Sequence, residues 1–309
     1  MINNIFIFIV SLFMVIKGAT IATKYSARLA ESFKLSKYVV GFIIIAIISI
    51  LPETFISINS AIEGIPAFGL GMLFGSNVAD MTIVFLVILL FSKKGIKIET
   101  KTLKNNRVYP FLLLLPLILG LDGNFSRVDG ATLIIVGAAF YYISFRRGID
   151  VSEAAKNRDG RYKNFMLLIG GMAIMLLGAH FTVTSATTLA NLLKINPILI
   201  GMLVVGLGTT LPEMLFALKS VEKNEDELAV GDILGTVLAD ATVVVGILAL
   251  INPFSFPQKI IYITGMFMVV ASILLFGLMS SGRLLSKKEG WSLFFFWLLF
   301  VLVEFATNR

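Results

Sequence analysis

The sequence contains no cysteine and a single histidine, His180. Without cysteine the chain can form neither a disulfide nor a thiolate metal centre, and one histidine argues against a zinc or copper site. Charged residues are also scarce, at 15% of the 309 residues, whereas hydrophobic residues reach 57%. A soluble domain usually has about 45–50% apolar residues. The composition therefore argues against a soluble fold.

Signatures of nucleotide-driven proteins are missing as well. The sequence has no P-loop, no GxGxxG segment after a predicted strand and no ATPase signature. Each of these motifs works by holding phosphate groups against backbone amides. Enzyme functions are therefore disfavoured, and any transport is predicted to be secondary rather than driven by ATP.

The apolar residues fall in blocks that approach the roughly 20 residues of a membrane-spanning helix. We predict an all-α polytopic membrane protein with ten transmembrane helices. No small-residue cleavage site follows the first block, so we expect no cleaved signal peptide. The predicted spans lie near residues 3–31, 37–62, 65–91, 107–122, 129–146, 163–190, 196–220, 228–251, 257–281 and 287–306.

Basic residues divide unequally between the two sides of these spans. Most of the 26 Lys and Arg residues fall in the first, third, fifth, seventh and ninth connections, whereas the opposite side has only Arg127, Lys194, Lys259 and Arg309. The positive-inside rule places the basic side in the cytoplasm. We therefore expect a multi-pass protein of the cell membrane, with the N- and C-termini outside.

The chain repeats itself at an offset of 160 residues. Leu51, Pro52 and Glu53 correspond to Leu211, Pro212 and Glu213, and Asp80 corresponds to Asp240. Glycines follow the same offset: Gly18 and Gly178, Gly41 and Gly201, Gly71 and Gly231, and Gly75 and Gly235. Chance matching of common apolar residues would not also match proline, glutamate and aspartate, so the pattern indicates a duplication.

Each half carries five predicted spans, an odd number, so the halves must enter the membrane in opposite orientations. We predict two inverted five-helix repeats, with broken helices at an ion site near the membrane midplane. The first repeat covers residues 1–150, with its motif at 41–80. Residues 151–163 form a cytoplasmic linker, and residues 164–309 form the second repeat, with its motif at 201–240.

Four acids in these apolar segments occupy matching positions of the two repeats. They are Glu53, Asp80, Glu213 and Asp240. Pro52 and Pro212 precede the glutamates, and proline removes a backbone hydrogen bond from a helix. A lone buried glutamate could be satisfied by a lysine or a backbone amide, but four acids in repeat register favour a functional site.

Oxygen ligands dominate this predicted site. Hydroxyls are available from Ser49, Ser76, Thr209, Thr210 and Thr236. Hard cations prefer oxygen, and Ca²⁺ takes about 6–8 such ligands. When a divalent ion leaves, the negative charge must be neutralised by Na⁺, by protons, or by both. This requirement favours an exchanger over a simple channel.

Two pairs of motifs resemble those of the sodium/calcium exchanger family, within the calcium/cation antiporter superfamily. That family carries a G-T-S-x-P-E-type motif in the second helix of each repeat and a G-S-N-x-x-[ND]-type motif in the third. The corresponding segments here are "ISILPE" (48–53) with "GSNVAD" (75–80), and "GTTLPE" (208–213) with "GTVLAD" (235–240). The resemblance extends from about Gly18 to the last predicted helix, and the motifs are of the prokaryotic type.

The resemblance implies a role for each matching position. Glu53 and Glu213 match the central calcium-ligating glutamates, and Asp80 and Asp240 match the polar pair of the third helices. The sodium-lining positions correspond to backbone carbonyls near Ala46 and Gly206 and to Ser49, Ser76, Thr209, Thr210 and Thr236. The first and sixth helices would slide past the other eight to alternate access.

The sequence departs from the family pattern at several positions. Ile48 replaces the first motif glycine, which we expect to stiffen the helix break, and Ile50 replaces a hydroxyl. Asp80 stands where Asn is more usual. These changes remove a sodium ligand and add an acid, so the sequence supports calcium better than sodium. Asp232 also replaces a common Asn, and we expect it to be a solvated residue at a helix end.

Other polar residues in the apolar segments have simpler interpretations. We expect Lys17 to extend to the membrane interface, with pairing to a site carboxylate as the alternative. His180 is expected to be packed or wetted, although a proton role is conceivable. The segment 222–227, "EKNEDE", is predicted to be a solvated turn, with a regulatory calcium site as the weaker alternative, and Glu304 is predicted to be interfacial.

The sequence thus predicts a secondary antiporter that exchanges Ca²⁺ for Na⁺ by alternating access. The alternatives are exchange of Ca²⁺ or other divalent cations for protons and, from another class, a cation channel or a non-transporting sensor. The expected partners are inorganic cations and the lipid bilayer. We expect no nucleic acid, no obligate protein partner, no enzyme activity and no cofactor apart from the transported ions.

Overall fold

The computed structural model describes residues 2–30, 42, 46–92, 94–98, 108–147, 161–282 and 284–307. Within these residues, helices dominate, and six of them are long and apolar enough to cross a membrane: Pro66–Phe91, Tyr162–Leu193, Pro197–Glu222, Asp226–Ile251, Ile260–Gly282 and Lys287–Thr307. Two shorter apolar helical stretches are Ile2–Gly18 and Tyr109–Leu119. The prediction of an all-α, multi-pass membrane protein is confirmed at this level. The predicted linker lies outside the described residues up to residue 160.

The first half begins with a long helix and continues with interrupted ones. Its elements are α1 (Ile2–Ala30), α3 (Ala46–Ser49), α4 (Leu51–Ile62), α5 (Pro66–Ala79), the π-helix η2 (Asp80–Val84), α6 (Phe85–Phe91), strand β1 (Ile96–Lys97), α8 (Tyr109–Leu112), α9 (Leu114–Leu119), strand β2 (Asn124–Phe125) and α10 (Arg127–Arg147).

The second half repeats much of this order. Its elements are α11 (Arg161–Leu193), α12 (Pro197–Ile200), π-helix η3 (Gly201–Val205), α13 (Gly206–Thr209), α14 (Leu211–Glu222), α15 (Asp226–Ala239), π-helix η4 (Asp240–Val244), α16 (Val245–Ile251), strand β3 (Phe254–Ser255), π-helix η5 (Ile260–Gly265), α17 (Met266–Gly282), strand β4 (Leu284–Leu285) and α18 (Lys287–Thr307).

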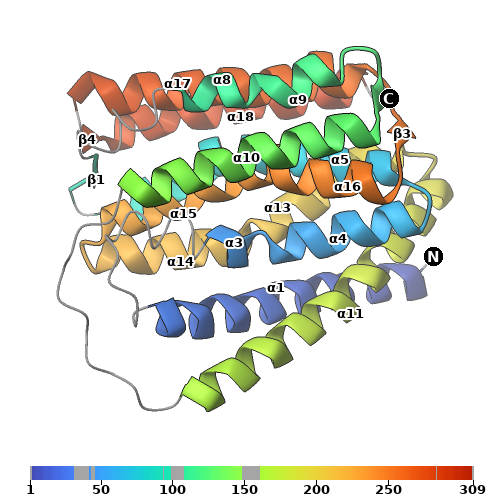
Figure 1. Cartoon of the computed structure of the whole chain (residues 1–309), viewed down its shortest axis with the longest axis horizontal. Coiled ribbons are helices and arrows are strands. Elements are labelled where there is room, and N and C mark those ends of the chain that lie inside the picture. Colours follow the sequence, from blue (N-terminus) through green and yellow to red (C-terminus); the bar gives the residue numbers. More distant parts are fainter. Residues whose placement is uncertain are drawn as a thin grey trace.

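Corresponding elements have the same length and are displaced by 160 residues. This holds for α3 and α13, α4 and α14, α5 and α15, η2 and η4, α6 and α16, and α10 and α18. The two short antiparallel strand pairs each join one half to the other, because β1 pairs with β4 and β2 pairs with β3. Figure 1 shows β1 and β4 at one end of the bundle and β3 at the opposite end.

Burial separates a central layer from a peripheral one. In the segments Pro66–Phe91 and Asp226–Ile251, 83% of the most apolar stretch is buried inside the protein. The corresponding share is 33% in Tyr162–Leu193 and 22% in Lys287–Thr307. A helix that is apolar all round belongs in a protein core or in lipid. The two central segments are therefore enclosed by protein, while α1 and α11 lie together along one edge of the bundle (Figure 1).

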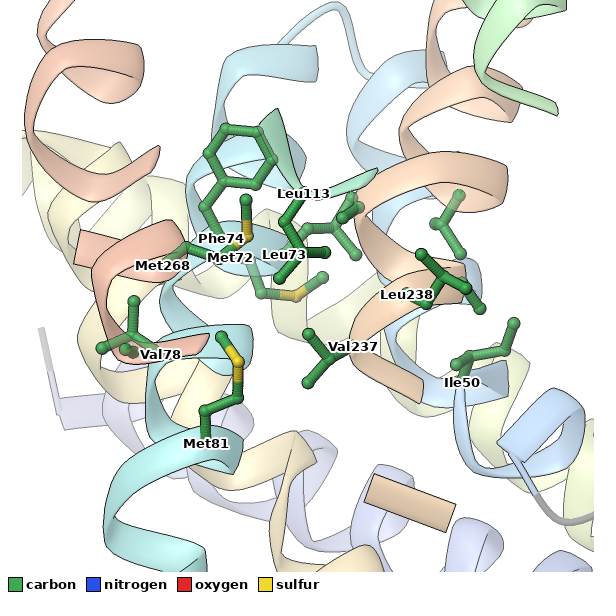
Figure 2. Packing of buried hydrophobic residues seen from close by; sticks show 14 of the residues in the cluster. Ile50, Met72, Leu73, Phe74, Val78, Met81, Leu113, Val237, Leu238 and Met268 are labelled. Atoms are coloured by element: carbon green, nitrogen blue, oxygen red, sulfur yellow. The ribbon is translucent and has the colours of Figure 1, made fainter. Parts of the chain in front are cut away.

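The core between the central helices is made of methionine, leucine and valine side chains. Figure 2 shows Met72 and Leu73 of α5, Met81 of η2, and Val237 and Leu238 of α15 in one buried cluster. These side chains fill the space between helices that belong to different halves of the chain. The cluster therefore fixes the two central segments against each other.

Glycines allow the backbones of the two halves to touch. A Cβ on Gly75 would lie 2.5 Å from the Met202 carbonyl oxygen, and one on Gly235 would meet the Phe42 carbonyl oxygen. Small residues permit this kind of close helix packing in membranes. Each central segment is therefore packed tightly at the glycine that lies five residues before its aspartate.

Candidate functional site

The helix that carries Glu53 is interrupted at one residue. Helix α3 ends at Ser49 and α4 begins at Leu51, with Ile50 between them at φ −72° and ψ −4°. The amide of Ile50 still donates to the Ala46 carbonyl at 3.0 Å. Because Pro52 has no N–H, the carbonyl of residue 48 lacks its usual helical donor. The result is a tight kink with a freed carbonyl.

The helix that carries Glu213 has the same interruption. Thr210 lies between α13 and α14 at φ −73° and ψ −14°, and Pro212 is again the second residue of the following helix. The predicted helix breaks are therefore present, although each lies two residues before its proline. Ile48 in place of glycine leaves the first kink at the equivalent residue, so the expected stiffening does not remove it.

Glu53 and Glu213 project from the first turns of α4 and α14 into the protein interior. Each is only 1% exposed. The Thr209 hydroxyl donates to the Gly206 carbonyl at 2.9 Å and also lies within hydrogen-bonding reach of the Glu53 carboxylate. Glu53 Oε2 and both carboxylate oxygens of Glu213 are buried without a hydrogen-bond donor. Such buried oxygens are costly unless a cation or a proton satisfies them.

Asp80 and Asp240 each occupy the first position of a π-helix. π-bulges occur frequently at functional sites because they change the direction of side chains within a helix. The sequence analysis did not predict them. A signal was present in the shared Asp-x-Thr pattern, since Thr82 and Thr242 both donate back to the carbonyl four residues earlier, and such bonds often bend helices.

The acids lie close enough to repel one another. The charge of Asp80 interacts with those of Glu53 and Asp232, and the charge of Asp240 interacts with those of Glu53 and Asp80. The charge of Glu213 interacts with those of the other four acids. The structure thus brings the four predicted acids together and adds a fifth. Among the described residues, however, no three acidic or histidine side chains meet tightly enough to hold a metal ion alone. A bound cation therefore requires hydroxyl or carbonyl oxygens as well.

The predicted hydroxyl residues supply such oxygens, and all of them are buried. Ser49 donates to Asp232 Oδ1 at 2.9 Å, Ser76 to the Leu73 carbonyl at 3.0 Å, and Thr210 to the Leu207 carbonyl at 3.0 Å. Thr236 Oγ1 makes no hydrogen bond. A hydroxyl that donates its proton elsewhere keeps its lone pairs free for a cation.

The backbone positions Ala46 and Gly206 begin α3 and α13 and are both buried. The Gly206 carbonyl accepts from the Thr210 amide at 3.2 Å. The same carbonyl also accepts from the Thr209 hydroxyl at 2.9 Å. Both of its lone pairs are therefore engaged in this structure, and a cation there would replace the hydroxyl donor. The eleven predicted site residues therefore all lie in the interior, on or beside the two kinked helices and the two central helices.

Asn77 is a buried polar residue of the same region that the sequence analysis did not select. Its amide nitrogen donates to the Val237 carbonyl at 3.2 Å, and its Oδ1 has no donor. The counterpart of Asn77 at the 160-residue offset is Val237, so the repeat comparison gave no signal. Its place within "GSNVAD" was the available clue.

Two predictions about acidic residues are wrong. Asp232 is fully buried in α15 rather than solvated, because α15 begins at Asp226 and residue 232 lies almost two turns inside it. Glu304 is 1% exposed rather than interfacial, because Thr264 of η5 donates to its Oε1 at 2.5 Å. In both cases a hydroxyl from another helix donates to one oxygen of the carboxylate.

The other polar residues considered in the sequence analysis are at least partly exposed. Lys17 is exposed, with its ammonium 5.4 Å from the centre of the Phe13 ring, as expected for a side chain that avoids the site. His180 Nδ1 lies 3.7 Å from Glu63 Oε1, and both side chains are partly exposed. In the predicted turn 222–227, Asp226 accepts from the Lys97 amide at 2.8 Å.

Membrane proteins of bacteria and archaea are among the relatives of this chain. The chain is 28% identical to an uncharacterized membrane protein of Methanocaldococcus jannaschii over 235 residues, which cover 75% of this chain and 77% of the relative. It is 27% identical to the inner membrane protein YrbG of Escherichia coli, over 79% of each chain. A sodium/calcium exchanger of Methanosarcina acetivorans is 22% identical over 98% of each chain.

The fold is also similar to a solved structure. The sodium-calcium exchanger NCX_Mj, in a structure soaked with Na⁺, superposes with a TM-score of 0.73 and 24% identity, covering 100% of this chain and 99% of the other. The family described as sodium/calcium exchanger protein matches residues 3–146 and 163–306, which is most of the sequence. The chain therefore belongs to the sodium/calcium exchanger family, a family of transporters rather than enzymes.

Proposed function

We propose that the protein is a secondary antiporter that exchanges Ca²⁺ for Na⁺ across the cell membrane by alternating access. One observation carries the proposal. Acidic side chains from two kinked helices and two central helices lie in one buried region that also contains hydroxyls. Each kinked helix carries a glutamate directly after a proline, and each central helix carries an aspartate at the first position of a π-helix. Membership in the exchanger family and the sodium/calcium exchanger named among the relatives agree with this function.

We assign the charged residues of the site mainly to Ca²⁺ and its neutral oxygens to Na⁺. Glu53 and Glu213 bind Ca²⁺ between the two kinks, because a divalent cation needs more than one carboxylate in a low-dielectric interior. The hydroxyls and carbonyls near Ala46 and Gly206 provide neutral oxygens for Na⁺. These are the side chains of Ser49, Ser76, Thr209, Thr210 and Thr236. Asp80 and Asp240 adjust the charge at the centre.

Exchange follows from the cost of leaving this site without cations. Several carboxylates in a buried region repel one another, and an uncompensated charge within a membrane protein costs several kcal/mol. Ca²⁺ can therefore leave only when other positive charge replaces it. This requirement couples the two ion fluxes without any ATP-binding element.

We extend the proposal to ten spans arranged as two inverted repeats, residues 1–150 and 164–309. The spans are α1, α3–α4, α5–α6, α8–α9, α10, α11, α12–α14, α15–α16, η5–α17 and α18. The equal elements at an offset of 160 residues and the reciprocal strand pairs support a pseudo-twofold relation. The basic residues of the connections support a location of both termini outside the cell under the positive-inside rule.

In this mechanism α1 and α11 are the mobile pair. They pack against each other along one edge of the bundle (Figure 1), and their glycines keep the contact close. A Cβ on Gly18 would lie 2.7 Å from the Gly171 carbonyl oxygen, and a Cβ on Gly178 would lie 2.9 Å from the Ser11 carbonyl oxygen. This close contact holds the two helices together, so that they move as one unit across the eight other spans.

The test is uptake of radioactive calcium by proteoliposomes that contain the purified protein. Either a sodium gradient or a proton gradient is imposed, and Glu213→Gln serves as the inactive control. We expect uptake driven by sodium. Uptake driven only by protons would replace Na⁺ with H⁺ as the counter-ion, and calcium flux down its own gradient without any counter-ion would identify a channel.

A further inference from the structure

A fifth acid, Asp232, joins the two halves of the protein at the ion site. It lies on α15, its exposed fraction is 0%, and its Oδ1 accepts from the Ser49 hydroxyl of α3 at 2.9 Å. Its other oxygen, Oδ2, is buried without a hydrogen-bond donor. Asp232 also lies close enough to Asp80 and Glu213 for their charges to interact. A buried carboxylate with a free oxygen close to two other acids needs a physical explanation.

The hydrogen bond sets the orientation of Ser49. A serine hydroxyl has one proton and two lone pairs, so donation to Asp232 leaves its lone pairs for another partner. The other predicted site hydroxyls with a hydrogen bond donate to carbonyls of their own helical segments, as Thr209 does to Gly206 and Thr210 to Leu207. Ser49 instead donates to a carboxylate. Hydrogen bonds to carboxylates are roughly twice as strong as those between neutral groups.

The first half has no equivalent acid. Residue 72, the counterpart of Asp232 at the 160-residue offset, is a methionine with an exposed fraction of 0%. Figure 2 shows Met72 among the apolar side chains of the core. The Thr209 hydroxyl, which corresponds to that of Ser49, therefore has no acid at residue 72 to accept its hydrogen bond. Thr210 provides a second hydroxyl there, whereas Ile50 provides none.

We propose that Asp232 is a positioning and specificity-determining residue that makes Ser49 a strong ligand for Na⁺ on the α3 side of the site. Its carboxylate accepts the hydrogen bond of the serine hydroxyl and thereby directs the hydroxyl lone pairs toward a small hard cation. This compensates for the missing hydroxyl at Ile50. The proposal rests on the proposed sodium/calcium exchange, because it assigns a residue to the sodium part of that site.

The effect of Asp232 should be specific to the monovalent ion. Ca²⁺ is held mainly by Glu53 and Glu213, whose charges outweigh one polarised hydroxyl. Na⁺ depends on neutral oxygens, so each hydroxyl ligand contributes a larger part of its binding free energy than it does for Ca²⁺. A structural role for Asp232 in helix packing would instead weaken both ions together or lower stability without either ion.

The experiment measures binding of Na⁺ and of Ca²⁺ as the concentration of each ion that gives half of its thermal stabilisation of the purified protein. Asp232→Asn keeps a hydrogen-bond acceptor for Ser49 but removes the charge. We expect the half-saturating Na⁺ concentration to rise by about fivefold or more, with less than a twofold change for Ca²⁺. Asp232→Met, which copies residue 72, should give at least the same sodium shift.

A double variant separates action through Ser49 from a general effect. If Asp232 works through this hydroxyl, Ser49→Ala/Asp232→Asn should bind Na⁺ no more weakly than Ser49→Ala alone. The matched control is Glu304→Gln, which neutralises another buried carboxylate that accepts a threonine hydroxyl outside the site. It should leave half-saturation by both ions unchanged.

Three results would overturn the inference: an unchanged sodium requirement in Asp232→Asn, equal shifts for Na⁺ and Ca²⁺, or additive losses in the double variant. Absence of any stabilisation of the unmodified protein by Na⁺ would overturn it as well. The proposed exchange fails separately, because proteoliposomes can lack sodium-driven calcium uptake while Na⁺ still stabilises the purified protein.

Discussion

The two kinked helices share a backbone geometry but differ in the side chains around it. Both are interrupted three residues before the glutamate, and both precede a central helix whose aspartate opens a π-helix. The kink of the second half carries Gly208 and Thr210, where the first half carries Ile48 and Ile50. Fewer polar groups therefore come from the first kink itself.

This difference shows which features a duplicated site must retain. Both halves share the proline, the glutamate and the aspartate, which supply the freed carbonyls and the charges of the proposed divalent-ion site. Hydroxyls are unequally distributed, and one acid, Asp232, is present in one half alone. The two sides of the site therefore offer different environments to a monovalent ion, and the halves are not interchangeable.

The largest expected effect tests what the two halves have in common. Glu53→Gln and Glu213→Gln should each reduce calcium uptake by roughly 100-fold or more, since losing about 3 kcal/mol of binding free energy has that consequence. Removing one of several repelling carboxylates should not lower the thermal unfolding temperature measured without ions.

The control for these variants is Glu63→Gln. Glu63 caps the same helix as Glu53, but its side chain is partly exposed and faces His180. We expect calcium uptake to be nearly unchanged, because exposed ion pairs contribute little. Activity retained in Glu213→Gln but lost in Glu63→Gln would contradict the site assignment.

The second effect concerns the glycines that hold the central helices against the other half. Gly75→Ala and Gly235→Ala should each lower the free energy of unfolding by about 1–3 kcal/mol, because the added methyl meets backbone carbonyl oxygens of Met202 and Phe42. The measurement is thermal unfolding in detergent. Gly170→Ala and Gly277→Ala are matched controls, since a Cβ at either position has nothing within 4 Å.

The controls should leave stability unchanged or raise it by about 0.5–1 kcal/mol, because alanine is favoured over glycine in helices. A loss confined to Gly75→Ala or to Gly235→Ala would show that the two close approaches are not equivalent. That outcome would mean that one half of the chain can accommodate a methyl group at its close helix contact and the other cannot.

The helices and the four repeat-paired acids were predictable from sequence because their signals are local or repeated. Apolar runs indicate spans by length, and the match of proline, glutamate and aspartate at one offset indicates a candidate site without knowledge of the fold. The kinks were also predictable, since Pro52 and Pro212 cannot donate a helical hydrogen bond.

Burial of the other acids could not be predicted in the same way. Asp232 follows the charged segment 222–227 closely, so its position resembles a solvated helix end, and only the partner Ser49 from α3 explains its burial. Glu304 lies near the end of α18, and its partner Thr264 is supplied by η5. These partners are set by packing between distant helices, which no local pattern specifies.

A smaller effect is expected where the halves carry matching aspartates. Asp80 stands where the resembling family more often has asparagine, so Asp80→Asn should be tolerated better than Asp240→Asn. We expect calcium half-saturation in uptake to rise by about threefold for Asp80→Asn, which corresponds to less than 1 kcal/mol, and by about tenfold for Asp240→Asn. Equal losses would show that both acids are required in this chain.

The smallest effect would make the first kink resemble the second. Ile50→Thr adds a hydroxyl at the position that corresponds to Thr210, where the hydroxyl donates to the carbonyl three residues earlier. The added oxygen should lower the half-saturating Na⁺ concentration in calcium uptake by about two- to threefold, as expected for one neutral ligand. Ile50→Val has nearly the shape of threonine without its hydroxyl and should leave the sodium requirement unchanged. If valine and threonine act alike, space at the kink rather than oxygen limits sodium binding, and the inequality between the halves concerns packing instead of ion ligands.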